Sequence, residues 1–476
     1  MTEFSRLELD EADLRAMVAA ALDRICDQLR ALPGQPACVT EGGAELARSL
    51  REPAPREGAP LEPLLATLFD RALSVSFTTT SPGYLAYIPG GGLLHAAVAD
   101  LIADAINRFV GLWRAAPGLV QLESNVIAWL AEVVGLPAGA GGVLTSGGSL
   151  ANFSATVAAR HRLGERFQDG TIYTSTQAHH SVVRAALLAG FPAAQVRAVA
   201  VDASQRVRVD LMAAAIAEDR ARGLRPCMIV GSAGTTNTGA VDDLEGLAEL
   251  AAREQLWLHV DAAYGGCFAL TQRGRERLRG LGLADSITLD PHKGLFLPYG
   301  TGALLVREPQ ALRRAHGLHA DYLPPMQEDP DFFDFCEMSP ELSRDFRGLR
   351  LWLPIKLCGL DVFAAALDEK LDLAAHAAQV LRATPGIEIV AEPQLSLLAF
   401  RHVPVALRGD VAAIDAHNQR LLAAINRRAR VYMTSTLLDG RFVLRICVLS
   451  FRTHRDRIDA GLADIEAAIA ELAQFA

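Results

Sequence analysis

The chain has 476 residues, of which 50% are hydrophobic and 21% charged, so it can bury the cores of two or three domains. Its formal net charge of −9 argues against nucleic-acid binding, because contact with phosphates needs a concentrated basic face and none is visible. The seven cysteines are odd in number and contain no CxxC pair, so neither a disulfide framework nor a zinc site is indicated.

The N-terminal residues predict neither export nor membrane insertion. They are acidic and lack the apolar core of a secretion signal, and no stretch reaches the roughly 18 apolar residues that a membrane span requires. We therefore expect a cytoplasmic protein without membrane association.

Two helical stretches are predicted in the first 80 residues. Apolar residues recur at helical spacing from Asp10 to Leu32 and from Leu61 to Val75, on either side of a segment that contains proline and glycine. We predict that residues 1–80 form a separate helical part with an exposed apolar stripe.

Residues 81–359 predict a large domain built on a mostly parallel sheet. Strand-like apolar runs alternate here with helical stretches, as in crossover units whose helices cover a sheet. The runs that predict strands are 143–145, 171–174, 228–231, 256–260, 286–289 and 302–306.

Residues 360–476 predict a smaller α+β domain. A helix is followed by strands at 387–390 and 395–400, a second helix, and a hairpin across Asp439-Gly440, which is a favoured two-residue turn. The whole chain is therefore predicted to have an α/β fold with a second, smaller C-terminal domain.

Two segments carry the clearest chemical signal. His259-Val-Asp-Ala-Ala-Tyr264 and the run from Asp285 to Gly294 each contain a short apolar stretch that stops at polar residues, as buried strands do at the mouth of an α/β sheet. Lys293 and Asp261 are the two groups that pyridoxal phosphate needs: an amine for the Schiff base and a carboxylate that keeps the pyridine nitrogen protonated. A lone aspartate at a strand end is otherwise more often a helix cap or a structural residue.

Asp290-Pro-His-Lys293, together with the upstream His259–Tyr264 motif, resembles the group II pyridoxal-phosphate-dependent decarboxylases, the family of aromatic amino acid, histidine and glutamate decarboxylases. The resemblance covers most of residues 81–359. It implies fold type I, pyridoxal 5′-phosphate as cofactor, and conversion of an L-amino acid, aromatic or similar, to the amine and carbon dioxide. It also implies a homodimer with shared active sites, in which residues 1–80 pack on the partner subunit.

The same resemblance assigns cofactor contacts. Leu144–Asn152 follows a strand and opens a helix, so its N–H groups can face a phosphate, although such a loop alone is more often an ordinary turn. The family binds the phosphate at the positions of Gly148 and Ser149, with His292 nearby. It places a histidine on one face of the pyridine ring, a small alanine on the other, and a threonine near the phenolic oxygen; the matching residues are His179, Ala263 and Thr236.

His179 and His180 are adjacent, and taken alone such a pair is more often a surface or core feature than a catalytic one. A metal site would need further ligands, and the sequence shows none. We choose His179 as the catalytic histidine from its place in the motif.

Counting on from Lys293 without gaps places Tyr322 at the family's loop tyrosine, which donates the proton that completes amine formation. Aldehyde synthases of the family carry phenylalanine at this position. A loop tyrosine can also simply pack on the surface. We predict Tyr322 as the proton donor.

The substrate pocket is predicted by position alone, because aromatic side chains belong to the core by default. The residues that match the family's pocket region are Tyr84, Tyr87, Ile88, Phe109, Trp113 and Ser343. Histidine decarboxylases carry serine at the position of Ser343 and aromatic amino acid decarboxylases carry glycine. Glycines at 90–92 and at 294 replace bulkier family residues, which predicts a reshaped pocket.

Three alternatives stay open at this point. Decarboxylation-dependent oxidative deamination and transamination use the same scaffold, and Arg445 is a candidate for holding a substrate carboxylate or, more simply, for a structural ion pair. Tyr322 favours decarboxylation. A non-catalytic paralogue is the third alternative, and the intact set of Lys293, Asp261 and His179 argues against it.

Overall fold

The computed structural model describes residues 7–317, 326, 329 and 331–474. The chain forms two compact units: unit 1 contains Met1–Tyr84, Leu421–Met433 and Arg452–Ala476, and unit 2 contains Leu85–Arg420 and Thr434–Phe451. The division into domains at residues 80 and 359 remains a prediction from the sequence.

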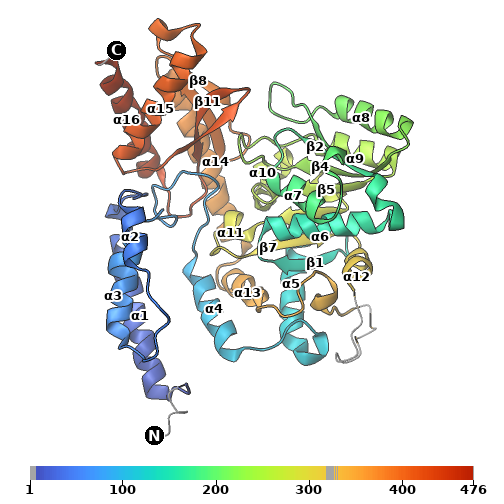
Figure 1. The fold of residues 1–476 in the computed structure, drawn as a ribbon, viewed down its shortest axis with the longest axis horizontal. Helices are drawn as coiled ribbons and strands as arrows, with labels where there is room; N and C mark the ends of the chain where they lie inside the picture. The colour runs from blue at the N-terminus through green and yellow to red at the C-terminus, as the bar shows by residue number, and fades with distance from the viewer. Residues whose placement is uncertain (1–6, 318–325, 327–328, 330, 475–476) are drawn as a thin grey trace. The chain divides into compact units, whose positions relative to one another are not determined.

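Unit 2 is built on a seven-stranded sheet with the order β1-β7-β6-β5-β4-β2-β3. The strands are β1 Gly141–Thr145, β2 Gly170–Ser175, β3 Val196–Val199, β4 Arg225–Ser232, β5 Trp257–Asp261, β6 Ser286–Leu289 and β7 Gly302–Val306. All neighbours pair in parallel except β7, which runs antiparallel to both β1 and β6. The prediction of a mostly parallel sheet is confirmed (Figure 1).

Helices cover this sheet because each turns an apolar stripe toward it. In α9 (Leu244–Glu254) the buried residues Leu244, Leu247, Leu250 and Ala251 recur at helical spacing, and α9 packs against β4 and β5. The Asp243 carboxylate caps the helix by accepting a hydrogen bond from the Gly246 N–H group at 3.1 Å.

The remaining α-helices that lie wholly within unit 2 are α4 Leu94–Ile106, α5 Pro117–Val133, α6 Gly148–His161, α7 His180–Leu188, α8 Val209–Ala221, α10 Gln272–Arg277, α11 Pro291–Gly294, α12 Gln310–His316, α13 Arg347–Cys358 and α14 Leu360–Ala383. Among them, α5 contacts β1 and β7, α6 contacts β5, β6 and β7, and α8 contacts β2, β3 and β4.

The second sheet of unit 2 is small and antiparallel, with the order β10-β11-β9-β8. Its strands are β8 Ile387–Ala391, β9 Leu397–His402, β10 Thr434–Leu438 and β11 Arg441–Cys447. The hairpin turn has positive φ angles at both Asp439 (50°) and Gly440 (74°), as a type I′ turn requires, so this predicted hairpin is confirmed.

Unit 1 holds the N-terminal helices α1 Glu11–Ala31, α2 Gly43–Ser49 and α3 Leu61–Ala66, together with α16 Arg455–Ala473. The helix α15 (Val411–Arg427) runs through both units. The predicted helix over Leu61–Val75 is α-helical only as far as Ala66 and continues as a π turn over Thr67–Arg71. No described residue of α1 is buried, and its apolar side chains Leu14, Met17, Leu22 and Ile25 are exposed within this chain.

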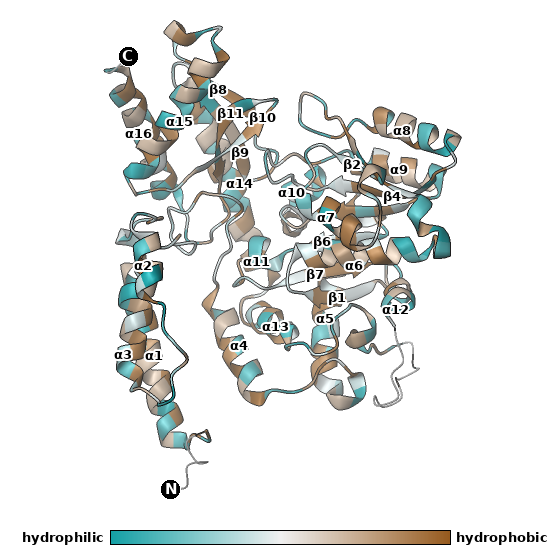
Figure 2. Cartoon of the chain, viewed as in Figure 1, coloured by the Kyte–Doolittle hydropathy of each residue, from teal (hydrophilic) through white to brown (hydrophobic). Residues whose placement is uncertain are grey.

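Hydrophobic residues also dominate α4 (Figure 2). Its exposed apolar side chains form a stripe at helical spacing: Leu94, Val98, Leu101, Ile102 and Ile106. Within the part of the chain that the structure describes, no helix combines the length and the apolarity needed to cross a lipid bilayer.

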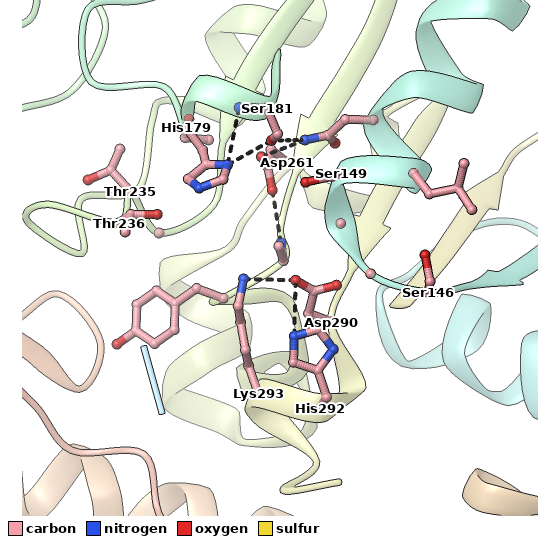
Figure 3. Close-up of a pocket in the computed structure, with 18 residues that line it drawn as sticks. Ser146, Ser149, His179, Ser181, Thr235, Thr236, Asp261, Asp290, His292 and Lys293 are labelled. Carbon is pink, nitrogen blue, oxygen red and sulfur yellow. Dashed lines mark hydrogen bonds and ion pairs between the residues drawn. The ribbon is translucent and has the colours of Figure 1, made fainter. Parts of the chain in front are cut away.

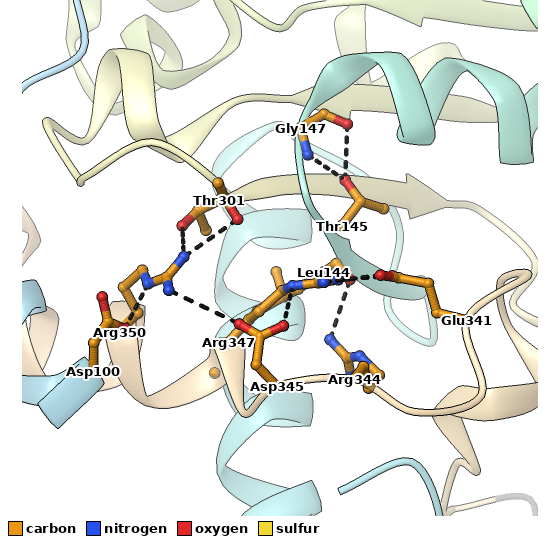
Figure 4. A network of polar contacts seen from close by, with 12 residues as sticks. Asp100, Leu144, Thr145, Gly147, Thr301, Glu341, Arg344, Asp345, Arg347 and Arg350 are labelled. Carbon is orange, nitrogen blue, oxygen red and sulfur yellow. Dashed lines mark hydrogen bonds and ion pairs between the residues drawn. The ribbon is translucent and has the colours of Figure 1, made fainter. Parts of the chain in front are cut away.

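A buried ionic network supports the loop that follows β1 (Figure 4). Arg344 and Glu123 form an ion pair at 2.6 Å with both side chains fully buried, and Arg344 also donates to the Leu144 carbonyl oxygen at 3.1 Å. Arg347 donates to the same carbonyl oxygen at 3.2 Å and to both carboxylate oxygens of Glu341. The C-terminal end of β1 is thereby fixed where α6 begins.

We predict that Glu123→Gln lowers the free energy of unfolding by about 3 kcal/mol, because it leaves the Arg344 guanidinium charged and unpaired in the interior. Urea unfolding followed by far-UV circular dichroism measures the change. The matched control is Glu218→Gln, which removes an exposed pair with Arg222 whose side chains are each 61% exposed, and there we expect a loss below ~0.5 kcal/mol. Equal losses in the two variants would contradict the prediction.

Candidate active site

A cavity of about 250 Å³ opens in unit 2 where the parallel strands end. The carboxyl ends of strands are where α/β sheets place their ligand sites. The cavity is lined by side chains and loops that follow β1, β2, β4, β5 and β6 (Figure 3): Ser146, Gly147, Gly148, Ser149, Leu150, Asn152, His179, Ser181, Ser232, Gly234, Thr235, Thr236, Asp261, Ala263, Tyr264, Asp290, His292 and Lys293.

Lys293 lies on the short helix α11, and its Nζ atom is 2.8 Å from Oδ2 of Asp290. Burial by itself would lower the pKa of Lys293, but the adjacent Asp290 carboxylate outweighs it and the net pKa is raised. The amine is therefore held as an ammonium ion. The paired carboxylate can take its proton when the amine has to act as a nucleophile.

Asp261 ends β5 and is 9% exposed. Its Oδ2 accepts a hydrogen bond from Asn152 Nδ2 at 3.0 Å, and its Oδ1 accepts one from the Ala263 N–H group at 3.1 Å. These contacts hold the carboxylate in one orientation on the cavity wall, as Figure 3 shows.

His179 caps the N-terminus of α7 and lies on the cavity wall, whereas His180 is exposed and is not among the described lining residues. The Ser181 N–H group donates to Nδ1 of His179 at 3.3 Å, and the Ser181 hydroxyl lies 2.7 Å from the same atom. Because Nδ1 accepts, the proton of the neutral ring belongs on Nε2. Burial lowers the pKa of His179, which favours that neutral form.

The N-terminus of α6 opens toward the cavity. Gly147 has a φ of 155°, and a Cβ atom at Gly148 would lie 3.1 Å from Oδ2 of Asp290. The absence of side chains at 147 and 148 lets an anion approach the backbone at the start of the helix, and the helix dipole favours a negative charge there. Ser146 and Ser149 add hydroxyl groups to the same rim.

His292 closes the other side of this rim. Its Nδ1 atom donates to the Thr301 carbonyl oxygen at 2.6 Å, so in the neutral ring Nε2 has no proton. Burial lowers the pKa of His292 and favours that neutral ring. Thr301 is fixed in turn by Arg350, which donates to its hydroxyl at 2.9 Å.

The residues present fit pyridoxal phosphate. The cavity offers an amine on Lys293, a fixed carboxylate on Asp261, an imidazole on His179, and a helix N-terminus without side chains that suits a phosphate. Thr236 and Ala263 also line it, so the structure brings together in one cavity all the predicted cofactor-binding residues. No group of three or more His, Cys, Asp or Glu side chains in the described ranges is arranged to hold a metal ion.

Asn152 and Asp290 are among the lining residues that the sequence does not predict as site residues. Asn152 lies one helical turn after Gly148, and Asp290 lies three residues before Lys293, so both share a face with a predicted site residue. This helical spacing was the available signal. The spacing alone does not reveal that Asn152 donates a hydrogen bond to Asp261 or that Asp290 forms an ion pair with Lys293.

Five of the predicted substrate-pocket residues belong to unit 2 but are not among the described residues that line the cavity: Tyr87, Ile88, Phe109, Trp113 and Ser343. Tyr87 is 48% exposed and Phe109 37% exposed. Tyr84 belongs to unit 1, where its ring lies 5.9 Å from that of Tyr432. Their role in substrate binding stays a prediction, and Tyr322 lies outside the described residues.

Arg445 in β11 is buried and forms no ion pair with any carboxylate of the described residues, so the suggestion of a structural ion pair is wrong. Its guanidinium instead donates to backbone carbonyl oxygens of Thr236, Asn237 and Tyr87. Burial lowers the pKa of Arg445, and the carbonyl dipoles take the place of a counter-ion. Arg445 thereby anchors the loop that carries Thr236.

The chain is similar to known proteins over nearly its whole length. Residues 45–403 match the family model described as the pyridoxal-dependent decarboxylase conserved domain. Over 468 residues the chain is 34% identical to an aromatic-L-amino-acid decarboxylase of Bacillus atrophaeus, covering 98% of this chain and 97% of the relative. It is 32% identical to an L-2,4-diaminobutyrate decarboxylase of Rhizobium meliloti, covering 93% of this chain and 89% of the relative.

A similar solved structure is that of Oryza sativa TDC with PLP and tryptamine. Its TM-score is 0.92 at 27% identity, with 98% of this chain and 99% of that chain covered. The fold and the cofactor implied by the sequence motifs agree with these findings.

Proposed function

The chain belongs to the pyridoxal-dependent decarboxylase family, whose cofactor is pyridoxal phosphate, and we propose that it converts an aromatic L-amino acid, or one of similar size, to the amine and carbon dioxide. The observation that carries this proposal is the convergence of Lys293, Asp261 and His179 on one cavity of about 250 Å³. The aromatic class is supported by the 34% identity to an aromatic-L-amino-acid decarboxylase.

Each residue has a separate task in this proposal. Pyridoxal phosphate, when bound, supplies an electron sink for the electron pair of the broken bond between Cα and the carboxylate. Lys293 would hold the cofactor covalently and exchange with the substrate amine, and Asp261 would keep a positive charge on the ring nitrogen. His179 would cover one face of the ring, opposite Ala263.

The phosphate would lie at the N-terminus of α6, against Gly148, Ser149 and His292. Tyr322 would deliver a proton to the carbon that has lost its carboxylate. Proton delivery at that atom separates amine formation from oxidative deamination, which releases an aldehyde.

We also propose a homodimer in which the partner subunit completes the substrate pocket. Two observations within unit 2 support it: the exposed apolar stripe of α4, and the exposure of Tyr87, Phe109 and Ser343, which do not line the cavity of their own chain among the described residues. Exposed apolar stripes of this kind are typical of protein interfaces.

The proposed function is tested by a substrate screen. We expect purified holoenzyme to release amine and carbon dioxide in equal amounts from an aromatic L-amino acid, with kcat/KM at least about tenfold above that for L-2,4-diaminobutyrate, a difference of ~1.4 kcal/mol. Hydrogen peroxide is measured in the same reactions. Preference for diaminobutyrate would contradict the proposed substrate class, and peroxide in proportion to substrate consumed would contradict amine formation.

A further inference from the structure

One buried amide connects the groups that surround the cofactor cavity. Asn152 lies on α6 and is 2% exposed. Its Nδ2 atom donates to Asp261 Oδ2 at 3.0 Å and to Ser181 Oγ at 2.9 Å. Both protons of the amide nitrogen are therefore used, one on the aspartate and one on the serine that contacts His179.

The amide oxygen of Asn152 is equally occupied. It accepts hydrogen bonds from His259 Nε2 at 2.9 Å and from Thr288 Oγ1 at 2.7 Å. With two donors on the oxygen and two acceptors at the nitrogen, the amide has a single orientation, because a flipped amide would lose all four contacts.

The hydrogen bonds of the residues that follow Asn152 in this network, His259, Ser286 and Trp257, also have a single direction. Burial lowers the pKa of His259 to about 4, so its ring is neutral at pH 7. Since Nε2 donates to Asn152, Nδ1 of His259 must accept, and the Ser286 hydroxyl lies 2.7 Å from it. Ser286 accepts in turn from the indole N–H group of Trp257 at 2.7 Å. An indole can only donate. Each hydrogen bond in this series, which runs from Trp257 through Ser286, His259 and Asn152, is therefore donated in the direction of Asp261.

We propose that Asn152 is a positioning residue for the reaction, which holds the Asp261 carboxylate in its orientation toward the cofactor's ring nitrogen and, through Ser181, fixes the tautomer of His179. This inference rests on the proposed function only in its assignment of the cofactor. One side chain thus aligns two groups from different elements, Asp261 at the end of β5 and His179 at the N-terminus of α7. Asparagine suits the task because it donates to a carboxylate while accepting from a neutral histidine.

Asn152→Asp is the sharpest test, since it keeps the shape and the accepting oxygen but replaces the donor to Asp261 with a second carboxylate. We expect the dissociation constant of pyridoxal phosphate, from quenching of tryptophan fluorescence, to rise about tenfold to a hundredfold. The visible circular dichroism of the bound cofactor should also change, because the ring loses its fixed partner. We expect kcat to fall by a similar factor, with KM changed less than about threefold.

Asn418→Asp is the matched control. Asn418 is also fully buried in unit 2 and has its amide bonded on both sides, to His402 and to Ile414, but it does not line the cavity. We expect its cofactor affinity to stay within about twofold of the wild-type value.

Thr288→Val provides a second variant in case Asn152→Asp does not fold. It removes one donor to the Asn152 oxygen and keeps the amide, so a smaller loss of cofactor affinity, about threefold, is expected. Unchanged affinity and unchanged circular dichroism in folded Asn152→Asp would overturn the proposal, as would an equal effect in Asn418→Asp. Activity on another substrate class would contradict the proposed function. The measurements of cofactor affinity would still test the role of Asn152.

Discussion

Lys293→Ala is expected to abolish decarboxylation, with kcat lowered on the order of 10³-fold or more, a barrier increase of about 4 kcal/mol. Lys293 is the only lysine that lines the cavity among the described residues, and no other amine is available to attach the cofactor. The variant also leaves the Asp290 carboxylate without its cation. Amine release measured with saturating pyridoxal phosphate tests the expectation.

The chain contains only three lysines, Lys293, Lys356 and Lys370, which makes the assignment easy to check. Reduction of the holoenzyme with borohydride followed by peptide mapping should find the cofactor on Lys293 alone. The exposed Lys356 provides the control, since Lys356→Ala should retain full activity. Activity above about a tenth of the wild-type value in Lys293→Ala, or label on another lysine, would show that the assignment is wrong.

The second large effect is expected for Asp261→Asn, which should lower kcat about 10²-fold or more, corresponding to ~2.7 kcal/mol. A neutral amide cannot hold a proton on the ring nitrogen as a carboxylate does. The fold should be preserved, because an amide oxygen can still accept the hydrogen bond from Asn152 Nδ2. Steady-state kinetics of a cofactor-saturated sample and the ¹⁵N chemical shift of labelled cofactor measure the two effects.

Asp285→Asn is the matched control for this substitution. Asp285 is half-buried and accepts a hydrogen bond from the Leu258 N–H group at 2.7 Å, but it precedes β6 and does not line the cavity. We expect its kcat to stay near the wild-type value. Normal kinetics in Asp261→Asn, or an equal loss in Asp285→Asn, would remove Asp261 from its proposed role.

The sheet could be predicted from the sequence where strands are buried apolar runs. The bounds predicted for 286–289 and 302–306 coincide with β6 and β7, because every residue of both strands is buried. The edge strand β3 was missed because its residues Val196–Val199 are mostly half-exposed, and Arg197 interrupts the apolar pattern. The antiparallel orientation of β7 could not be predicted, because the direction of a strand depends on the strands it pairs with and the amino-acid composition does not indicate it.

Residues of the candidate site could be predicted where the residue type itself indicates the chemistry. Lys293 and Asp261 stand out as a pair, because an amine and a carboxylate together are what pyridoxal phosphate needs, whereas a lone aspartate at a strand end is more often structural. Asn152 does not stand out, because its role depends on Asp261, which is 109 residues away in the chain. Sequence motifs thus identified the groups that face the ring but not the amide that orients them.

The antiparallel strand β7 has a consequence for biosynthesis. Among the described residues β1 is an edge strand that pairs only with β7, although Thr145 and its partner Gly302 are 157 positions apart in the chain. The N-terminus of α6 therefore reaches its final place only after residues 302–306 have left the ribosome and inserted between β1 and β6. Such long-range pairing forms slowly. The nascent chain is consequently expected to capture its cofactor late, after most of unit 2 has been synthesised.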